Sequence, residues 1–224
     1  MASPPPSPSA PPAHCIKEET EAQRGGACPR SQGPACFQAS SLPTQPPDGS
    51  VAILLYLSRK YEVPDHWYPQ DLQARARVDE YLAWQHTALR SSCTRAMWQK
   101  QMMFPVFLGE QVPPETLAST LAELDRCLQL LEDKFLKDQD FVAGPHISVA
   151  DLVAITELMH PVSAGCQVFK SRPKLAAWRQ RVEAEVGKDL FQEAHAAVMK
   201  VKDLPPADPA IKEKLKPSVQ GLLQ

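Results

Sequence analysis

The chain has 224 residues, a length sufficient for one or two domains. Its formal net charge is -2, and 22% of its residues are charged. This near-neutral balance, without a lysine or arginine run, argues against nucleic acid and against an anionic membrane surface as partners. No apolar run approaches the roughly 20 residues of a membrane-spanning helix, and we see no secretory signal at the N-terminus. The six cysteines form no CxxC motif and no tight group with histidine, which indicates reduced thiols in the cytoplasm and no metal site.

Residues 1–47 differ in composition from the rest of the chain. They hold 11 of the 23 prolines, and Ile16 and Leu42 are their only large aliphatic residues. Such a segment cannot bury enough apolar area to offset its chain entropy. We therefore predict a disordered, proline-rich tail. Its first proline run is also of the kind that SH3 and WW domains bind, although most such runs are plain tails.

The predicted order begins at residue 48. Ser50 is the expected N-cap of an apolar helix over 51–61, which is too apolar to stand alone and must pack against something. A short connector follows, and Asp71 opens one long helix that runs to about Met103 and ends before Pro105.

The second half of the chain has clearer helical spacing. The prolines at 113 and 114 begin a helix, whose apolar positions are Leu117, Leu121, Leu124, Leu128, Leu131 and Phe135. Pro173 begins another that ends at Gly187, and further helices are expected over 188–200 and, weakly amphipathic, over 211–224. We find no strand pattern, so the ordered part is predicted to be all-α, with five to seven helices.

One stretch predicts a central buried helix over 148–160. Ser148 and Asp151 have the spacing of a capping box, in which each side chain bonds the other residue's backbone amide. The helix is apolar on nearly every face, with Glu157 as its only other charge, and Pro161 is expected to end it. Asp151 could instead be a buried catalytic acid, but the cap explains it better.

Two features of the sequence could bind a ligand. Ser50 places a hydroxyl at a helix N-terminus, which suits a carboxylate, although most such serines bind only their own helix. Arg90, Trp98 and Met102 are spaced eight and four apart along one helix. A cation beside a soft apolar wall suits an amphiphilic ligand, and the alternative is core packing with a solvent-reaching arginine.

Three stretches resemble the theta class of cytosolic glutathione transferases. Residues 50–61 resemble the last helix of that family's glutathione-binding domain, residues 67–86 resemble the start of its helical domain, and residues 147–152 resemble the capping box of its central helix. The likeness runs from about residue 50 to the C-terminus.

The resemblance implies an all-α C-terminal transferase domain over 66–224, preceded over 48–65 by a remnant of the thioredoxin-like domain. It implies an enzyme of detoxification and glutathione metabolism, normally a cytosolic homodimer, that adds the glutathione thiolate to small electrophiles. Glutathione is then the co-substrate and no other cofactor is needed. Ser50 matches the serine that binds the γ-glutamyl carboxylate, Arg90 matches an active-site arginine, and Trp98 and Met102 match the wall of the electrophile pocket.

The chain departs from the family pattern in its first half. The family's thiol-activating serine lies in a Ser-Gln-Pro-x-Arg context, and Ser31-Gln32-Gly33-Pro34 is only a partial match with no strand before it. Gly49 stands where an acidic residue is expected, and the stretch from Cys93 to Pro105 is one residue longer than in relatives. We therefore expect a truncated variant of the family with impaired catalysis, the alternative being a non-catalytic helical protein-interaction module.

Overall fold

The computed structural model describes residues 49–221, and the predictions for the tail over 1–47 and for Ser31 lie outside these residues. The described part is helical and contains no strand, only an isolated β-bridge between Phe141 and Gly144. The α-helices are α1 (Ser50–Lys60), α2 (Leu72–Thr87), α3 (Leu89–Met97), α4 (Pro114–Leu130), α5 (Val149–Ser163), α6 (Pro173–Val186), α7 (Lys188–Met199) and α8 (Pro209–Gly221). Two short 3-10 helices, η1 (Asp65–Trp67) and η4 (Lys200–Asp203), and two π-helices, η2 (Trp98–Leu108) and η3 (Leu131–Leu136), connect them. The predicted all-α bundle is confirmed, but the described residues form eight α-helices where five to seven were expected.

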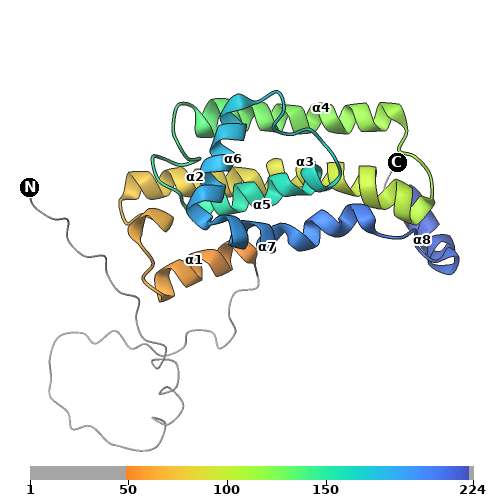
Figure 1. Ribbon diagram of the computed structural model, residues 1–224, viewed down its shortest axis with the longest axis horizontal. Helices are drawn as coiled ribbons and strands as arrows, with labels where there is room; N and C mark the ends of the chain where they lie inside the picture. Colours follow the sequence, from red (N-terminus) through yellow and green to blue (C-terminus); the bar gives the residue numbers. More distant parts are fainter. Residues whose placement is uncertain (1–48, 222–224) are drawn as a thin grey trace, which may run out of the picture. The chain divides into compact units, whose positions relative to one another are not determined.

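Helix α5 lies in the middle of the bundle, between α4 and α7 in the view of Figure 1. Ten of its 15 residues are buried, so it meets other helices on almost every side. The expected capping box is present: the Ser148 hydroxyl accepts from the Ala150 amide at 3.2 Å, and the Ser148 amide donates to Asp151 at 2.9 Å. A helix that is apolar nearly all round has thus become the centre of the core.

Pro161 does not end this helix, contrary to the prediction. The helix continues to Ser163, and Gly165, whose φ is +74°, follows its end. A proline removes only the one hydrogen bond that its own N–H would make. Beyond it the Ala164 amide bonds the His160 carbonyl at 3.4 Å and the Cys166 amide bonds the Pro161 carbonyl at 2.9 Å. The last turn is therefore retained, and Pro161 itself is buried.

The long helix expected over 71–103 is also different in the structure. Asp71 does cap its start, accepting from the Ala74 amide at 2.8 Å. The chain bends at Ala88, where φ is -100° and ψ is -76°, and this bend separates α2 from α3. From Trp98 the winding is that of a π-helix, which ends at Leu108 and has Gly109 as its C-cap residue. It passes through Pro105, contrary to the prediction that the helix ends before this proline. A π-helix accommodates residues that an α-helix of the same length cannot.

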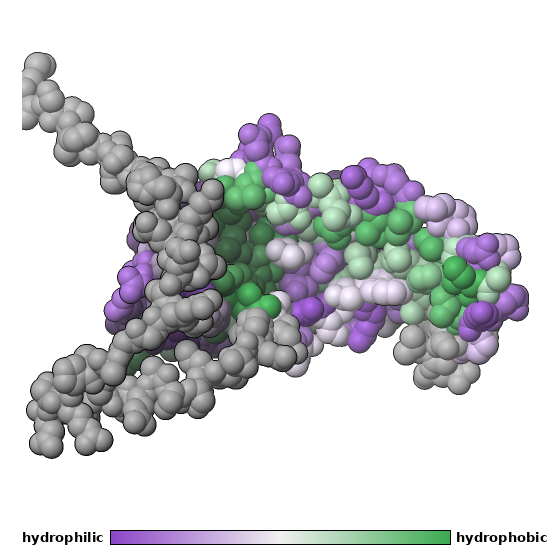
Figure 2. Space-filling model, turned by 90° about the horizontal axis from the view of Figure 1, so that it is seen from below, coloured by the Kyte–Doolittle hydropathy of each residue, from purple (hydrophilic) through white to green (hydrophobic). Residues whose placement is uncertain are grey.

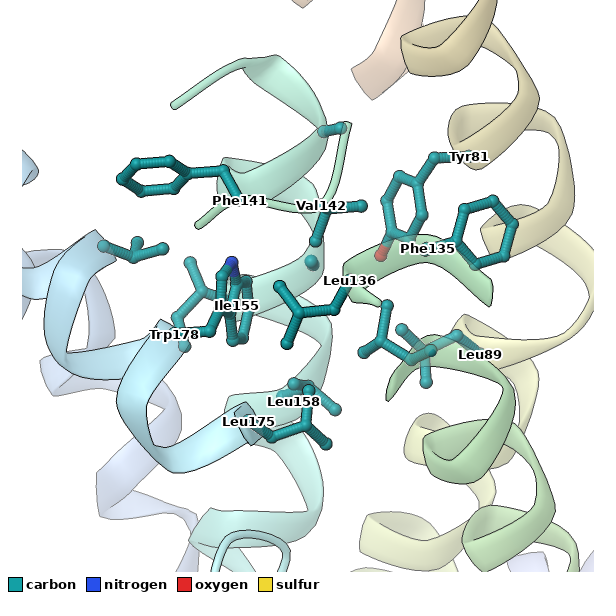
Figure 3. Close-up of a cluster of buried hydrophobic side chains, with 14 of the residues drawn as sticks. Tyr81, Leu89, Phe135, Leu136, Phe141, Val142, Ile155, Leu158, Leu175 and Trp178 are labelled. Atoms are coloured by element: carbon teal, nitrogen blue, oxygen red, sulfur yellow. The ribbon is translucent and has the colours of Figure 1, made fainter. Parts of the chain in front are cut away.

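The core is built on α5 from two sides. Tyr81 and Trp84 of α2 pack on Phe135 of η3, with ring centroids 5.3 and 4.7 Å from that ring. On the other side Leu175 and Trp178 of α6 are fully buried. Figure 3 shows Trp178 and Leu175 beside Ile155 and Leu158 of α5, with Leu136 between these residues and the pair of Tyr81 and Phe135. Helix α6 begins at Pro173 and ends before Gly187, as predicted.

The Asp151 carboxylate joins three segments inside this core. Besides the Ser148 amide, it accepts from the Val142 amide and from the Trp178 indole N–H, both at 2.8 Å. Burial raises the pKa of Asp151 above its ordinary value, while the hydrogen bonds from Val142, Trp178 and Ser148 oppose that rise. All these donors serve structure, so the geometry agrees with the capping interpretation and not with a catalytic acid.

Candidate functional site

Ser50 lies at the start of α1 but does not cap it. Gly49 is the N-cap residue, its carbonyl accepts the first helical hydrogen bond from Ile53 at 2.9 Å, and no side chain caps this end. Ser50 is already the first helical residue, so the expectation that it is the N-cap is wrong by one position. Its exposed side chain lies at the positive end of the helix dipole.

Arg90 of α3 faces a buried carboxylate of α5. Its Nε lies 3.7 Å from Oε1 of Glu157, whose side chain is 8% exposed, while that of Arg90 is 46% exposed. The other Glu157 oxygen lies 3.5 Å from Nδ1 of His160, one helical turn along α5. The three side chains form a cluster of one buried anion between a guanidinium and an imidazole, which we call the Arg90 cluster.

Polar atoms of the Arg90 cluster and of α2 are buried without a hydrogen-bond partner. Among the described residues, Glu157 Oε2, His160 Nδ1, Tyr81 Oη and Gln85 Oε1 are buried without a hydrogen-bond partner. Buried polar groups normally find a partner. The cluster therefore contains buried polar atoms that contribute no hydrogen bonds to the packing of the fold.

Cys93 lies against the same carboxylate. Burial first, and then the charge of Glu157, raise the pKa of the Cys93 thiol well above its ordinary value. Burial likewise raises the pKa of Tyr81 well above its ordinary value, with charges at Cys93, Asp151 and Glu157 adding to the effect. Both groups stay protonated at neutral pH, so neither supplies a thiolate or phenolate nucleophile.

Trp98 and Met102 lie on η2, beyond the α3 segment that carries Arg90. The Trp98 ring stacks on Phe107 of the same π-helix, with centroids 6.1 Å apart, and it is 42% exposed. Met102 is half-buried. The spacing argument assumed 3.6 residues per turn, but the π winding changes the angle between successive side chains. Five cavities among residues 49–221 are lined by other side chains, and none of these five joins Arg90, Trp98 and Met102.

The sequence reasoning missed Glu157 and His160 as members of a site. Glu157 did carry a signal, because it is the one acidic residue besides the capping Asp151 on a helix that is otherwise apolar. Its partner Arg90 is 67 positions away, and sequence spacing cannot pair residues on two different helices. Within residues 49–221 no three histidine, cysteine or acidic side chains gather as a metal site.

The sequence and the fold of the chain are similar to those of known proteins. Residues 94–185 match the family model for the glutathione S-transferase C-terminal domain. The mouse glutathione S-transferase theta-3 is 82% identical over 175 residues, which are 78% of this chain and 72% of that protein. The apo structure of human glutathione S-transferase T1-1 superposes with a TM-score of 0.72 at 74% identity, over 79% of this chain and 73% of the other.

A second solved relative is a ligand complex. The human glutathione transferase theta-2 structure, in complex with glutathione and an unknown ligand, is 45% identical with a TM-score of 0.68, over 77% of this chain and 72% of the other. The chain belongs to the glutathione S-transferase family, and within it to the theta class. Separately, none of the helices described between residues 49 and 221 is long and apolar enough to cross a membrane.

Proposed function

We propose that the helical part of this chain carries the electrophile side of a theta-class glutathione transferase site, with Arg90 as its cation and Trp98 and Met102 as its apolar wall. The observation that supports this most is the pairing of Arg90 with buried Glu157, because a buried carboxylate holds the guanidinium in one place while leaving it half exposed. A held cation can attract the leaving group of an electrophile. Ser50 would bind the γ-glutamyl carboxylate of glutathione at the N-terminus of α1.

The proposed domain organisation is a tail over 1–47, a remnant of the thioredoxin-like domain over 48–65 and the transferase C-terminal domain over 66–224. The family match at 94–185 falls inside the last of these. Helix α1 supports the second, since none of its residues is buried although seven of its 11 are apolar or aromatic. A helix of that composition is built to pack on a further layer.

We further propose that this polypeptide by itself conjugates glutathione poorly, and that it resides in the cytoplasm as a homodimer when folded. A thiol needs a positioned hydrogen bond to lower its pKa and hold the thiolate. Residues 1–47 contain 11 prolines and two large aliphatic residues, a composition that does not suit a folded thiol-binding site. Ser50, the first helical residue after Gly49, supports the proposal only as a contact for the γ-glutamyl carboxylate.

The test is titration calorimetry of glutathione into the purified chain, with its helicity verified by circular dichroism and its mass by light scattering. We expect glutathione to bind only weakly, with a dissociation constant of about 3 mM or above, in the range of weak complexes, and no detectable conjugation of a panel of alkyl halides and epoxides. Mouse glutathione S-transferase theta-3 is the active control. Conjugation by the pure chain that disappears in Ser31→Ala would contradict the proposal and assign the thiol activation to Ser31.

A second candidate function is a non-catalytic interaction module. The observation in its favour is the exposure of Ile53, Tyr56 and Leu57 on α1, each more than a third exposed. Figure 2 shows hydrophobic surface on the face seen from below, which is the side of α1 and α7 in Figure 1. A folded, monodisperse chain without affinity for glutathione would favour this function over the first.

A further inference from the structure

A second hollow lies away from the Arg90 cluster, at the start of the central helix. It has a volume of about 370 Å³, is partly open to solvent and is lined by the connector around η1, the first two turns of α2 and the segment that leads into α5. Its lining residues are Asp65, His66, Pro69, Asp71, Ala74, Val78, Ala143, Gly144, Pro145, His146 and Ser148. We call it the η1 cavity. Its size falls within the range of sites that bind small molecules.

The floor of the η1 cavity is apolar. Val78 is 1% exposed and belongs to the main core, so it is fixed in place. Ala74 and Ala143 add small side chains, and Pro69 and Pro145 add rigid rings from the two connecting segments. These small and rigid residues leave space that their neighbours cannot fill by changing rotamer. The cavity therefore offers apolar contact to a compact ligand.

The rim of the η1 cavity presents hydrogen-bond acceptors. His66 Nδ1 lies 2.8 Å from the Ile147 carbonyl, which can only accept, so Nδ1 carries the proton and Nε2 of the neutral ring is an acceptor. Asp65 uses one oxygen for the Gln70 amide at 2.9 Å, and Asp71 uses one for the Ala74 amide at 2.8 Å. Each carboxylate keeps a second oxygen, because an ionised carboxyl has about four lone-pair sites.

We propose that the η1 cavity binds a small apolar molecule that bears one protonated amine. An ammonium group brings several donors and a positive charge, and it meets Asp65, Asp71 and His66 at a rim that has acceptors to offer. The ring of the ligand lies on the floor formed by Val78 and Ala74. The two carboxylates repel anions, glutathione included, so this site differs in chemistry from the proposed transferase site.

The imidazole rings favour a flat ligand. The centroids of His66 and His146 are 6.5 Å apart and their planes are inclined by 55°. An aromatic ring of the ligand can contact their faces, and such aromatic contacts add affinity beyond that of burial alone. The preferred ligand is therefore an arylalkylamine rather than an aliphatic amine.

Three probes of one shape test the proposal on the full chain: 2-phenylethylamine, which is protonated at pH 7, 2-phenylethanol, which is neutral, and phenylacetate, which is anionic. Binding is measured by the changes in amide shifts in nitrogen–proton NMR spectra. We expect the amine to bind at least tenfold more tightly than the alcohol and phenylacetate not to bind. The largest shifts should fall on Ala74, Ala143 and Gly144.

Variants separate charge from shape. Asp65→Asn with Asp71→Asn removes the charges but keeps the acceptors and the helix cap, since asparagine caps as well as aspartate. We expect this double variant to lose at least tenfold affinity for the amine and none for the alcohol. Ala74→Leu fills the floor and should abolish binding of both. Asp133→Asn with Asp189→Asn, at two exposed positions elsewhere, is the matched control and should bind like the parent.

Circular dichroism of each variant shows whether it is folded, and the alcohol shows whether the cavity is intact in the double variant. Equal affinity for amine and alcohol would overturn the proposal. So would amide shifts that lie away from the η1 cavity, or a chain that binds none of the three probes.

Discussion

A buried glutamate organises the chemistry of the candidate site at the scale of single residues. Glu157 is held inside α5 and has Arg90 on one side and His160 on the other. Taking a carboxylate out of water is costly unless a cation compensates it. Arg90 is therefore neither a core residue nor a free surface residue. Its side chain reaches solvent, as the alternative from the sequence expected, but its charge also balances that of buried Glu157.

Removing Arg90 should cost more than removing the charge of Glu157. Arg90→Met leaves the carboxylate buried beside His160 alone, and we expect the free energy of unfolding to fall by about 1–3 kcal/mol. Glu157→Gln leaves an arginine that water can hydrate, so the loss should be smaller. Urea unfolding of both variants shows which of them loses more of the free energy of unfolding. Arg95→Met breaks the exposed pair with Glu123 and serves as control, with an expected loss of less than about 1 kcal/mol.

His195 should make the protein less stable in mild acid. Burial lowers the pKa of His195, while its hydrogen bond with the Phe191 carbonyl opposes this and the charges of Arg179 and His160 add to it. The unfolded chain therefore binds a proton at a higher pH than the folded one. Above a pH of about 6.5, the ordinary pKa of histidine in an unfolded chain, His195 does not reduce the free energy of unfolding. As the pH falls below that value, the free energy of unfolding decreases.

The test is the free energy of unfolding between pH 7.5 and 5.0. His195→Gln should reduce the slope of this curve, whereas His86→Gln, at an exposed histidine of α2, should leave the slope as it is. An identical slope in all three proteins would show that other groups account for the acid sensitivity.

At the scale of elements, helix starts were predictable and helix windings were not. The capping box of Ser148 and Asp151, the cap at Asp71 and the start of α6 at Pro173 all depend on residues within four positions of each other. The bend at Ala88 and the π winding from Trp98 depend on how α3 and η2 pack against distant helices. Local propensity carries no information about those contacts.

Helix α1 shows how one element can have both packed and exposed apolar residues. Leu55 packs against the core, whereas Ile53 and Leu57 are 37% and 39% exposed. We expect Ile53→Ser with Leu57→Ser to change the free energy of unfolding by less than about 1 kcal/mol while reducing self-association. Leu55→Ser, at the position midway between these two in the sequence, should lose about 2 kcal/mol or more.

Urea unfolding and concentration-dependent light scattering measure the two effects separately. If the double serine variant associates as strongly as the parent, the exposed apolar residues of α1 are not the source of self-association.

At the scale of the whole molecule, α5 and its first turn hold the bundle together. The all-α class and the central place of α5 were predictable, because a long apolar helix without strands around it has few other packing solutions. The pairing of Arg90 with Glu157 and the η1 cavity were not, because each joins segments more than 60 positions apart. The hydrophobic periodicity of a helix indicates which residues are buried, but it does not indicate which residues of other helices they contact.

Asp151 is the residue through which this global packing can be tested. Asp151→Ala leaves the Trp178 indole N–H and the amides of Val142 and Ser148 buried without an acceptor, and each such group costs about 1–3 kcal/mol. We expect a loss of at least 3 kcal/mol, seen as an earlier urea midpoint by both tryptophan fluorescence and circular dichroism. Asp79→Ala, on the surface of α2, is the control. A loss below 1 kcal/mol would mean that α5 is not held through this carboxylate.

The π-helix η2 has a consequence for how such proteins change over generations. Adding one residue to a packed α-helix rotates everything beyond it by about 100°, which turns the buried face to solvent. In η2 the wider winding takes up residues, and Phe104 and Val106 remain buried beyond it. A gene can therefore gain a codon in this segment without losing the fold. Under the proposed function, a new arrangement of Met102 and its neighbours in this segment is one route to a different choice of electrophile.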